Sequence, residues 1–335
     1  MKALVVRLDS FGDVLLAGPA VRAVAARCSR VAMLCGPQGA PAARLLPGVD
    51  EVIVWEAPWE GARPPSVREA DVDGLVRRLR EAAFGVALVL TSFHQSPLPT
   101  ALVLRLAGVA RIGADSVDHP GSLLDVRHRR RPGRHEAQAA LDTAAAMGFP
   151  PHAGDDGRLR VLPPPDTVAL TGNGPYVVVH PGASAPARAW SPGRCAEAVA
   201  LLAEAGHRVV VTGGPGEADL TRRVSGDTAV DLGGRTDPRT LAGVLRTADV
   251  VVCGNTGPAH LAAAVGTPVV SLFAPVVPAE RWAPYGVPSV LLGDQRAPCA
   301  DSRARHCPVP GHPCLEEVTG QDVVRAVRKL VEERA

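Results

Sequence analysis

Short apolar segments that suit buried strands alternate with helical patterns along almost the whole chain, and this alternation restricts the possible folds more than any other feature. Because the segments are almost continuously apolar, they are typical of parallel strands that helices cover on both faces. In the first half, strands are expected at residues 3–8, 31–34, 51–54 and 86–90, and helices at residues 14–28, 63–83, 101–107 and 137–147. This order of elements predicts an α/β fold.

The alternation starts again after a break that is rich in proline and glycine. The break runs from Pro163 to Pro175, and such residues are typical of linkers. Beyond it, strands are expected at residues 176–180, 208–212, 250–253 and 268–273, and helices from residue 191 and at residues 217–224, 237–248, 258–265 and 321–333. We predict two doubly wound parallel-sheet domains, at residues 1–165 and 166–320, and a C-terminal helix at residues 321–335.

The composition agrees with two ordinary folded domains. The chain has 335 residues, of which 46% are hydrophobic and 21% charged, so each half can bury a core. The formal net charge of +2 is too small to indicate a nucleic-acid partner. No segment approaches the ~20 apolar residues that span a bilayer, and the first strand begins near Met1 without a signal-peptide pattern. We expect a cytoplasmic protein with at most peripheral membrane contact.

The segment RLDSFGDV, at residues 7–14, follows the first predicted strand. Gly12 lets the backbone pass close to another group, and Asp13 comes at the start of the next helix, where ligands of doubly wound sheets bind. The Asp13 carboxylate has the chemistry of a base that accepts a hydroxyl proton. Taken alone, the residues favour the simpler role of a helix cap, which stabilises a helix by ~1 kcal/mol.

The segment CGNTGPAHL, at residues 253–261, connects a predicted strand to a helix that Pro258 begins. The amide groups of Thr256 and Gly257, together with the helix dipole, suit a diphosphate. His260, in the first turn, can add a hydrogen bond. An ordinary turn beside a packed histidine is the alternative, and the convergence of Gly, Thr and His favours phosphate.

Two further loops follow strands of the second half. After HPGAS, at residues 180–184, comes Arg188, whose guanidinium matches phosphate oxygens, although a solvated arginine is the alternative. We expect Trp190 to pack in the core rather than stack on a ligand. In GGPGE, at residues 213–217, Gly214 lets a nucleoside lie against the backbone, and Glu217 can accept bonds from ribose hydroxyls. This last signal is weak because such turns are common.

The motifs of three common enzyme classes are absent from the sequence. G-x-G-x-x-G does not follow the first strand, and neither a P-loop nor a G-x-S-x-G motif occurs. A dinucleotide dehydrogenase, a P-loop kinase and a serine hydrolase are therefore disfavoured.

In this order, the motifs resemble those of glycosyltransferase family 9, which includes heptosyltransferases. RLDSFGDV resembles the family's R-x-D-x-x-G-D-V opening, and GPAHLAAA, at residues 257–264, resembles its G-P-x-H-L-A-A-A loop. Arg188, Ala189 and Trp190 stand where the family has K-x-W-P, and the cysteine segment at residues 298–315 also resembles one found in many members. The likeness covers nearly the whole chain.

The resemblance implies a GT-B fold, in which two Rossmann-like domains face each other across a cleft. It implies an acceptor in the N-terminal domain, an ADP-heptose-like donor in the C-terminal domain, and inverting transfer of the sugar to an acceptor hydroxyl. It makes Asp13 the catalytic base, which reverses the preference for a cap. No metal or other cofactor is expected to be obligatory. The donor phosphates are assigned to Arg188, Thr256, Gly257 and His260, and the nucleoside to Glu217 and Gly214.

Two residues depart from the family pattern. Asn255 replaces the usual acidic residue, which removes a charge from the vicinity of the donor sugar, where Gly12 is also expected. Arg188 replaces a lysine, which keeps the charge and changes the geometry. The exact sugar and the nucleotide base therefore stay open.

The N-terminal half contains a basic run that suits an anionic acceptor, such as a phosphorylated or carboxylated glycolipid. A solvated loop is an equal alternative, and a small-molecule acceptor stays open. The run consists of Arg127, Arg129, Arg130, Arg131 and Arg134.

Cys299, Cys307 and Cys314 form a C-x7-C-x6-C cluster with His306 and His312 nearby. Because the spacing is not that of a zinc finger or ribbon, we expect reduced structural thiols rather than a metal site.

Two other classes of protein share the expected architecture. A GT-B-like nucleotide-sugar epimerase would consume the donor without any acceptor. A non-catalytic nucleotide-sugar-binding protein would bind the donor without transfer that depends on Asp13.

Overall fold

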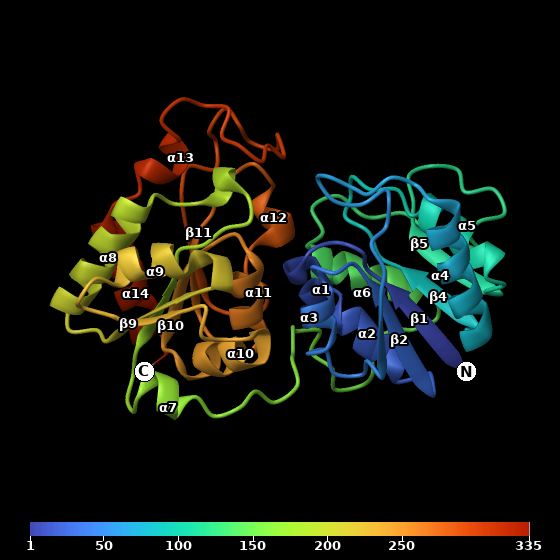
Figure 1. Ribbon diagram of the computed structural model, residues 1–335, viewed down its shortest axis with the longest axis horizontal. Coiled ribbons are helices and arrows are strands. Elements are labelled where there is room, and N and C mark those ends of the chain that lie inside the picture. Colours follow the sequence, from blue (N-terminus) through green and yellow to red (C-terminus); the bar gives the residue numbers. More distant parts are fainter. Residues whose placement is uncertain (335) are drawn as a thin grey trace. The chain divides into compact units, whose positions relative to one another are not determined.

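The computed structural model describes residues 1–334, which form two compact units, the first from Met1 to Leu162 and the second from Pro163 onward (Figure 1). Each unit contains one six-stranded parallel sheet with helices on both faces. The prediction of two doubly wound parallel sheets is therefore confirmed.

The first sheet has the strand order β3-β2-β1-β4-β5-β6, and all neighbouring strands are parallel. After β1 the chain forms β2 and β3 on one side of β1 and then β4 on its other side. The strand order therefore changes direction between β1 and β4. Its strands are β1 (Lys2–Val6), β2 (Arg30–Cys35), β3 (Glu51–Val54), β4 (Val86–Val89), β5 (Arg111–Asp115) and β6 (Val126–His128).

Two groups of helices cover this sheet (Figure 1). Leu4 and Val6 of β1 point toward the face that α4 and α5 cover, where they join Leu79 and Leu104 in one apolar cluster. The other helices pack against one another on the opposite face. The helices are α1 (Phe11–Leu16), α2 (Gly18–Ala25), α3 (Ala40–Ala43), α4 (Glu69–Ala82), α5 (Leu98–Leu106) and α6 (Glu136–Ala146).

The second sheet repeats this topology, with the order β12-β11-β10-β7-β8-β9 and parallel neighbours throughout. Its change of direction lies between β7 and β10. Its strands are β7 (Val177–His180), β8 (Val209–Gly213), β9 (Val230–Gly233), β10 (Val250–Gly254), β11 (Val269–Leu272) and β12 (Ser289–Leu292).

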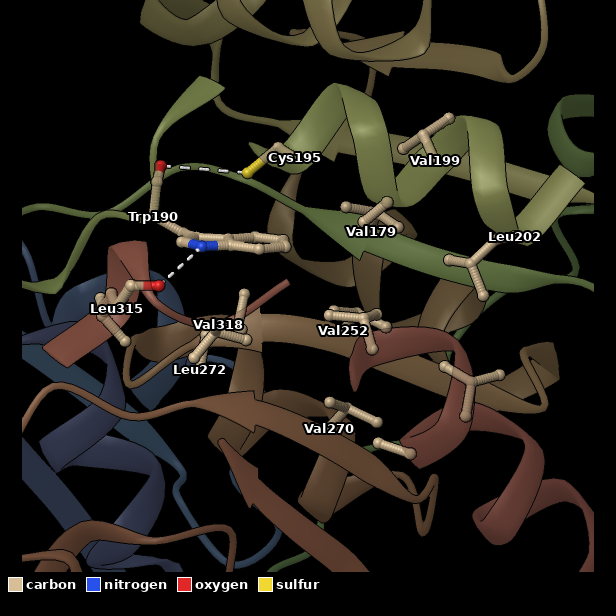
Figure 2. Close-up of a cluster of buried hydrophobic side chains, with 14 of the residues drawn as sticks. Val179, Trp190, Cys195, Val199, Leu202, Val252, Val270, Leu272, Leu315 and Val318 are labelled. Atoms are coloured by element: carbon tan, nitrogen blue, oxygen red, sulfur yellow. Dashed lines mark hydrogen bonds between the residues drawn. The ribbon is translucent and has the colours of Figure 1, made fainter. Parts of the chain in front are cut away.

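The core of the second unit lies between this sheet and the helices α8, α9 and α14 (Figure 2). The last helix, α14, packs on α8 and on β10, β11 and β12, so it completes one face of the second sheet. The helices are α7 (Val168–Thr171), α8 (Pro192–Glu204), α9 (Ala218–Ser225), α10 (Pro238–Thr247), α11 (Gly257–Ala264), α12 (Ala279–Trp282), α13 (Pro313–Glu316) and α14 (Gly320–Glu332), and two short 3-10 turns are η1 (Pro186–Arg188) and η2 (Pro215–Glu217).

Four strands were missing from the sequence prediction, namely β5, β6, β9 and β12. Three of these, β6, β9 and β12, lie at sheet edges, where a strand needs fewer apolar residues because one side has no neighbouring strand. In β6 the residues are Val, Arg and His, a composition that indicates a basic loop rather than a strand. Across residues 1–334, no helix is both long enough and apolar enough to cross a membrane.

Candidate active site

Ligands of doubly wound sheets bind beyond the carboxyl ends of the strands, where the strand order changes direction. In the first sheet Val6 pairs with Val89, so the loops after β1 and β4 begin at the same level. In the second sheet Cys253 pairs with His180, which aligns the loops after β10 and β7 in the same way. The sequence motifs therefore begin at the carboxyl edges of the two sheets.

Asp13 lies in the first turn of α1, and its carboxylate is held at both oxygens. The Ser10 hydroxyl donates to Oδ2 over 2.7 Å, and the Arg7 guanidinium donates to Oδ1 over 3.3 Å. The side chain is 18% exposed, so it is within reach of a ligand. Ser10, and not Asp13, occupies the N-cap position of α1. The simple capping role that the residues alone favoured is therefore wrong.

Arg7 is buried at the centre of a group of charges. Its Nη2 also lies 3.0 Å from Asp9 Oδ2 and donates to Ser92 Oγ over 2.8 Å, and its Nη1 lies 3.8 Å from Glu136 Oε2. Burial disfavours the charge on Arg7, but the carboxylates of Asp9, Asp13 and Glu136 outweigh burial and raise the pKa of the guanidinium. Arg7 is thus a permanent cation beside Asp13.

Glu60 lies at this same edge, and sequence reasoning missed it. The Gln95 amide donates to both Glu60 oxygens over 2.8 and 2.9 Å, and the Ser92 amide donates to Gln95 Oε1 over 2.7 Å. Burial, together with the negative charge of Asp9, raises the pKa of Glu60 to about 7. Glu60 follows β3 and Gln95 follows β4, so polar residues after these strands were the signal that could have identified them.

The structure divides the basic run into two groups. Arg127 donates to the backbone carbonyl oxygens of Ser116 and Val117. Arg130 and Arg134 form ion pairs with carboxylates of their own unit. Arg129 and Arg131 are exposed on the loop between β6 and α6. Three of the five arginines predicted to bind an acceptor therefore bind the protein itself, which sequence could not distinguish because all five look alike.

In the second unit, the Arg188 loop approaches the end of β10. A Cβ at Gly254 would lie 2.9 Å from the Arg188 carbonyl oxygen, so glycine permits this close approach. Thr256 occupies the N-cap position of α11, and His260 is buried in the helix. The Thr256 amide donates to the Gly254 carbonyl oxygen over 2.9 Å, so it takes part in the turn itself. The residues predicted to bind phosphate thus lie along one edge of the second sheet.

Asn255, predicted to lie near the donor sugar, is buried, and its amide Nδ2 lies 3.4 Å from the carbonyl oxygen of Ala274. Gly12 is buried within α1 of the first unit. Asn255 directly precedes Thr256 in the second unit, and Gly12 directly precedes Asp13 in the first unit.

Glu217 closes the turn after β8. Its Oε2 accepts a hydrogen bond from the Gly214 amide over 2.7 Å, and the same oxygen lies 3.9 Å from Nε2 of His180. Nδ1 of His180 lies 3.0 Å from Thr212 Oγ1. Burial lowers the pKa of His180, against the opposing effect of Glu217, and so favours the neutral ring. The loops HPGAS and GGPGE, which sequence reasoning treated separately, therefore form one structure.

The cysteine segment and Trp190 belong to the core of the second unit. Trp190 is buried, and its indole N–H donates to the Leu315 carbonyl oxygen over 3.0 Å, as Figure 2 shows. Cys299 and Cys314 are buried free thiols, and burial, followed by the neighbouring Cys299 and Cys307, raises the pKa of Cys314 to about 12. Within residues 1–334, no group of three or more His, Cys, Asp or Glu side chains could hold a metal ion.

Solved structures with the same fold include several heptosyltransferases. ADP-heptose lps heptosyltransferase II of E. coli matches with a TM-score of 0.75 and 19% identity over 100% of both chains. The family 9 glycosyl transferase of Veillonella parvula matches with a TM-score of 0.78 and 17% identity over 99% of this chain and 97% of that one. E. coli heptosyltransferase WaaC, solved with ADP-2-deoxy-2-fluoro heptose, matches with a TM-score of 0.71 and 21% identity over 100% of both chains.

The sequence also matches a protein family directly. No curated protein matches the sequence significantly. Residues 72–312, more than half of the chain, match the family described as glycosyltransferase family 9 (heptosyltransferase). Together with the fold of its two sheets, this match shows that the chain is a glycosyltransferase and belongs to glycosyltransferase family 9.

Proposed function

We propose that this glycosyltransferase transfers a heptose or a related sugar from an ADP-sugar-type donor to an acceptor hydroxyl, with inversion and with Asp13 as the general base. One observation carries the proposal: the Asp13 carboxylate lies at the carboxyl edge of the first sheet, where Arg7 and Ser10 hold its two oxygens. A hydroxyl donor and a cation at its oxygens favour the ionised form of a carboxylate, and the negative charge of nearby Asp9 acts against it. A fixed, ionised carboxylate is what the removal of a hydroxyl proton requires.

In this proposal the donor diphosphate binds at the carboxyl edge of the second sheet. WaaC was solved with an ADP-linked heptose analogue, which supports an ADP-sugar as the class of donor. Arg188 supplies charge, and His260 and the Gly257 amide supply hydrogen bonds. Thr256, the N-cap residue of α11, places the positive end of the helix dipole at the diphosphate.

The nucleoside is assigned to the turn after β8. Glu217, which the Gly214 amide holds in place, has acceptor atoms for ribose hydroxyls. Gly12 and Asn255 are assigned to the vicinity of the donor sugar, because Gly12 adjoins the proposed base Asp13 and Asn255 adjoins the proposed phosphate-binding residue Thr256.

The proposed reaction is a single displacement. Asp13 accepts the proton of the acceptor hydroxyl while that oxygen forms a bond to the anomeric carbon. The bond from this carbon to the donor phosphate oxygen breaks, and its electron pair leaves with the nucleoside diphosphate. Arg188, His260 and the N-terminus of α11 stabilise the charge that grows on the leaving group, so we expect no obligatory metal.

For the acceptor, the exposed pair Arg129 and Arg131 suits an anionic glycolipid. The contacts of Arg127, Arg130 and Arg134 with their own protein leave these two as the candidates for acceptor binding. A small-molecule acceptor is the second possibility for the same reaction.

Two measurements test the proposal. A thermal-shift panel of ADP-, GDP- and UDP-linked sugars identifies the nucleotide, and we expect ADP-linked sugars to stabilise the protein most. Asp13→Ala should then lower kcat by about 10²–10⁴-fold and keep donor affinity. Unchanged turnover in Asp13→Ala would contradict the assignment of the base, and consumption of donor without any acceptor would indicate an epimerase instead.

A further inference from the structure

All three guanidinium nitrogens of Arg130 have protein partners. Nε donates to Asp115 Oδ2 over 2.9 Å, Nη2 donates to the Thr91 carbonyl oxygen over 2.9 Å, and Nη1 binds Glu136 Oε1. These partners lie at the end of β5, just after β4 and at the start of α6. The side chain is 10% exposed. Arg130 is therefore fixed by the fold at the carboxyl edge of the first sheet.

Glu136 connects Arg130 to Arg7. Its carboxylate is almost completely buried, with Oε1 bound to Arg130 and Oε2 3.8 Å from Arg7 Nη1. Burial raises the pKa of Glu136, and the two arginines oppose this rise. A buried carboxylate that loses one of two cations draws more strongly on the other.

The two terminal nitrogens of the Arg7 guanidinium contact different groups. Nη1 faces Glu136, whereas Nη2 contacts Asp13, Asp9 and Ser92. A row of alternating charges thus runs from Asp115 through Arg130, Glu136 and Arg7 to Asp13. Because the guanidinium is a rigid plane, the position of Nη1 beside Glu136 and the position of Nη2 beside Asp13 depend on each other.

We propose that Arg130 is a positioning residue for Asp13, acting through Glu136 and Arg7. Arg130 binds Oε1 of Glu136 and offsets part of its charge. Nη2 of Arg7 then stays turned to the Asp13 carboxylate, which favours the ionised form of Asp13 and holds its Oδ1 in place. This inference rests on the proposed role of Asp13 as the base. It gives Arg130 a different task from the acceptor binding that its place in the basic run indicated.

Arg134 provides a matched control. It lies four residues further along the same segment and forms a two-point ion pair with Asp142 of α6, over 2.8 and 2.7 Å. Asp142 is not one of the carboxylates in the row of charges that ends at Asp13. Arg134→Gln therefore removes a paired arginine of the same region, and Arg134 is not among the charges that shift the pKa of Glu136 or of Arg7.

The test is a carbon-13 NMR titration of the Asp13 carboxyl in the full chain, with labelled aspartate and the resonance assigned by its loss in Asp13→Asn. The variants are Arg130→Gln, Arg130→Lys and Arg134→Gln. The other titratable groups near Asp13, namely Asp9, Glu60, Glu136, Asp115 and His128, are present in all of them. This measurement needs neither donor nor acceptor.

In Arg130→Gln we expect the Asp13 titration midpoint to rise by about 0.5 pH unit or more, because a cation is lost and Arg7 turns toward Glu136. Arg130→Lys, which keeps the charge, should give a smaller rise, and Arg134→Gln none. A midpoint that Arg130→Gln leaves unchanged, or that both glutamine variants move equally, would overturn the proposal. If Arg130→Gln does not fold, Arg130→Lys is the deciding variant. The proposal requires the Asp13 titration midpoint to rise in Arg130→Lys as well, and an unchanged midpoint there would overturn it.

The NMR titration and the activity of Asp13→Ala test the two proposals separately. Full transfer activity in Asp13→Ala would reject Asp13 as the base, whereas the NMR shift measures only whether Arg130 acts on Asp13. A shift without any effect of Asp13→Ala would leave the electrostatic connection intact and reject the catalytic role.

Discussion

The Glu217 carboxylate packs directly against the backbone of Gly182. A Cβ at position 182 would come within 2.0 Å of Glu217 Oε1, a distance at which the side chain must move. Gly182 follows β7 and Glu217 ends the turn after β8. The absence of a side chain in one loop therefore determines where the carboxylate of the other loop lies.

Gly182→Ala should displace Glu217 and weaken donor binding by about 10-fold, which corresponds to about 1.4 kcal/mol. Gly216→Ala is the control, because a Cβ there meets nothing within 4 Å. Neither glycine has a positive φ, so both substitutions leave the backbone unstrained. Isothermal titration with ADP measures the effect. Equal affinity in both variants would show that the position of Glu217 does not matter for the nucleotide.

Glu60 should make the stability of the first unit depend on pH. Its pKa of about 7 lies above the ordinary 4.5, so the folded protein holds this proton more tightly than the unfolded chain does. Ionised Glu60 therefore destabilises the fold above pH 7, and this cost disappears as the pH falls toward 4.5.

Glu60→Gln should consequently raise Tm relative to the wild type at pH 8 and leave it nearly unchanged at pH 4.5. Glu56→Gln, at an exposed position of the same loop, is the control. Thermal unfolding at the two pH values measures both. A Tm difference that is the same at pH 4.5 and pH 8 would contradict the burial of an ionisable Glu60.

Asp155 should stabilise the first unit through its ion pair with Arg22. Nε and Nη2 of Arg22 donate to the two Asp155 oxygens over 2.7 and 2.8 Å, and this contact lowers the pKa of Asp155 to about 2. The stabilisation is present above the ordinary carboxyl pKa of 3.8 and is lost as the pH falls through about 2.

At pH 7, Asp155→Asn should lower the free energy of unfolding by about 1 kcal/mol, because the ion pair has two hydrogen bonds but is only partly shielded from solvent. Asp156→Asn breaks a more exposed ion pair with Arg160 and should cost about 0.5 kcal/mol or less. Urea denaturation compares the two variants. Equal losses would mean that the partly buried Arg22–Asp155 ion pair stabilises the protein no more than the exposed Asp156–Arg160 pair does.

Arg129 and Arg131 should affect the acceptor alone. Replacing both with Gln should raise KM for an anionic glycolipid acceptor by about 10-fold and leave kcat and donor affinity unchanged, because surface charge acts mainly on encounter and binding. The double variant Arg222→Gln/Arg223→Gln, exposed on α9, removes the same charge elsewhere. Steady-state kinetics at two salt concentrations compare the acceptor KM of the two double variants. An unchanged KM would remove the proposed role of the pair.

The alternation of strands and helices was predictable because a strand buried on both faces must be apolar. Val177–His180 and Val250–Gly254 are central strands, and both were identified. Val126–His128 was missed because an edge strand can carry an arginine and a histidine. Sequence reasoning therefore succeeded where burial restricts residue type and failed where it does not.

By itself, the sequence determined the fold class, the motifs and the family, because these depend on the order of residues along the chain. Only the tertiary structure decided which charges meet. Arg130 and Arg134 are chemically identical and four residues apart, yet one faces Glu136 and the other Asp142. The physical reason is that parallel strands joined by crossovers bring together side chains from the ends of β1, β4 and β5, and no local pattern records those contacts.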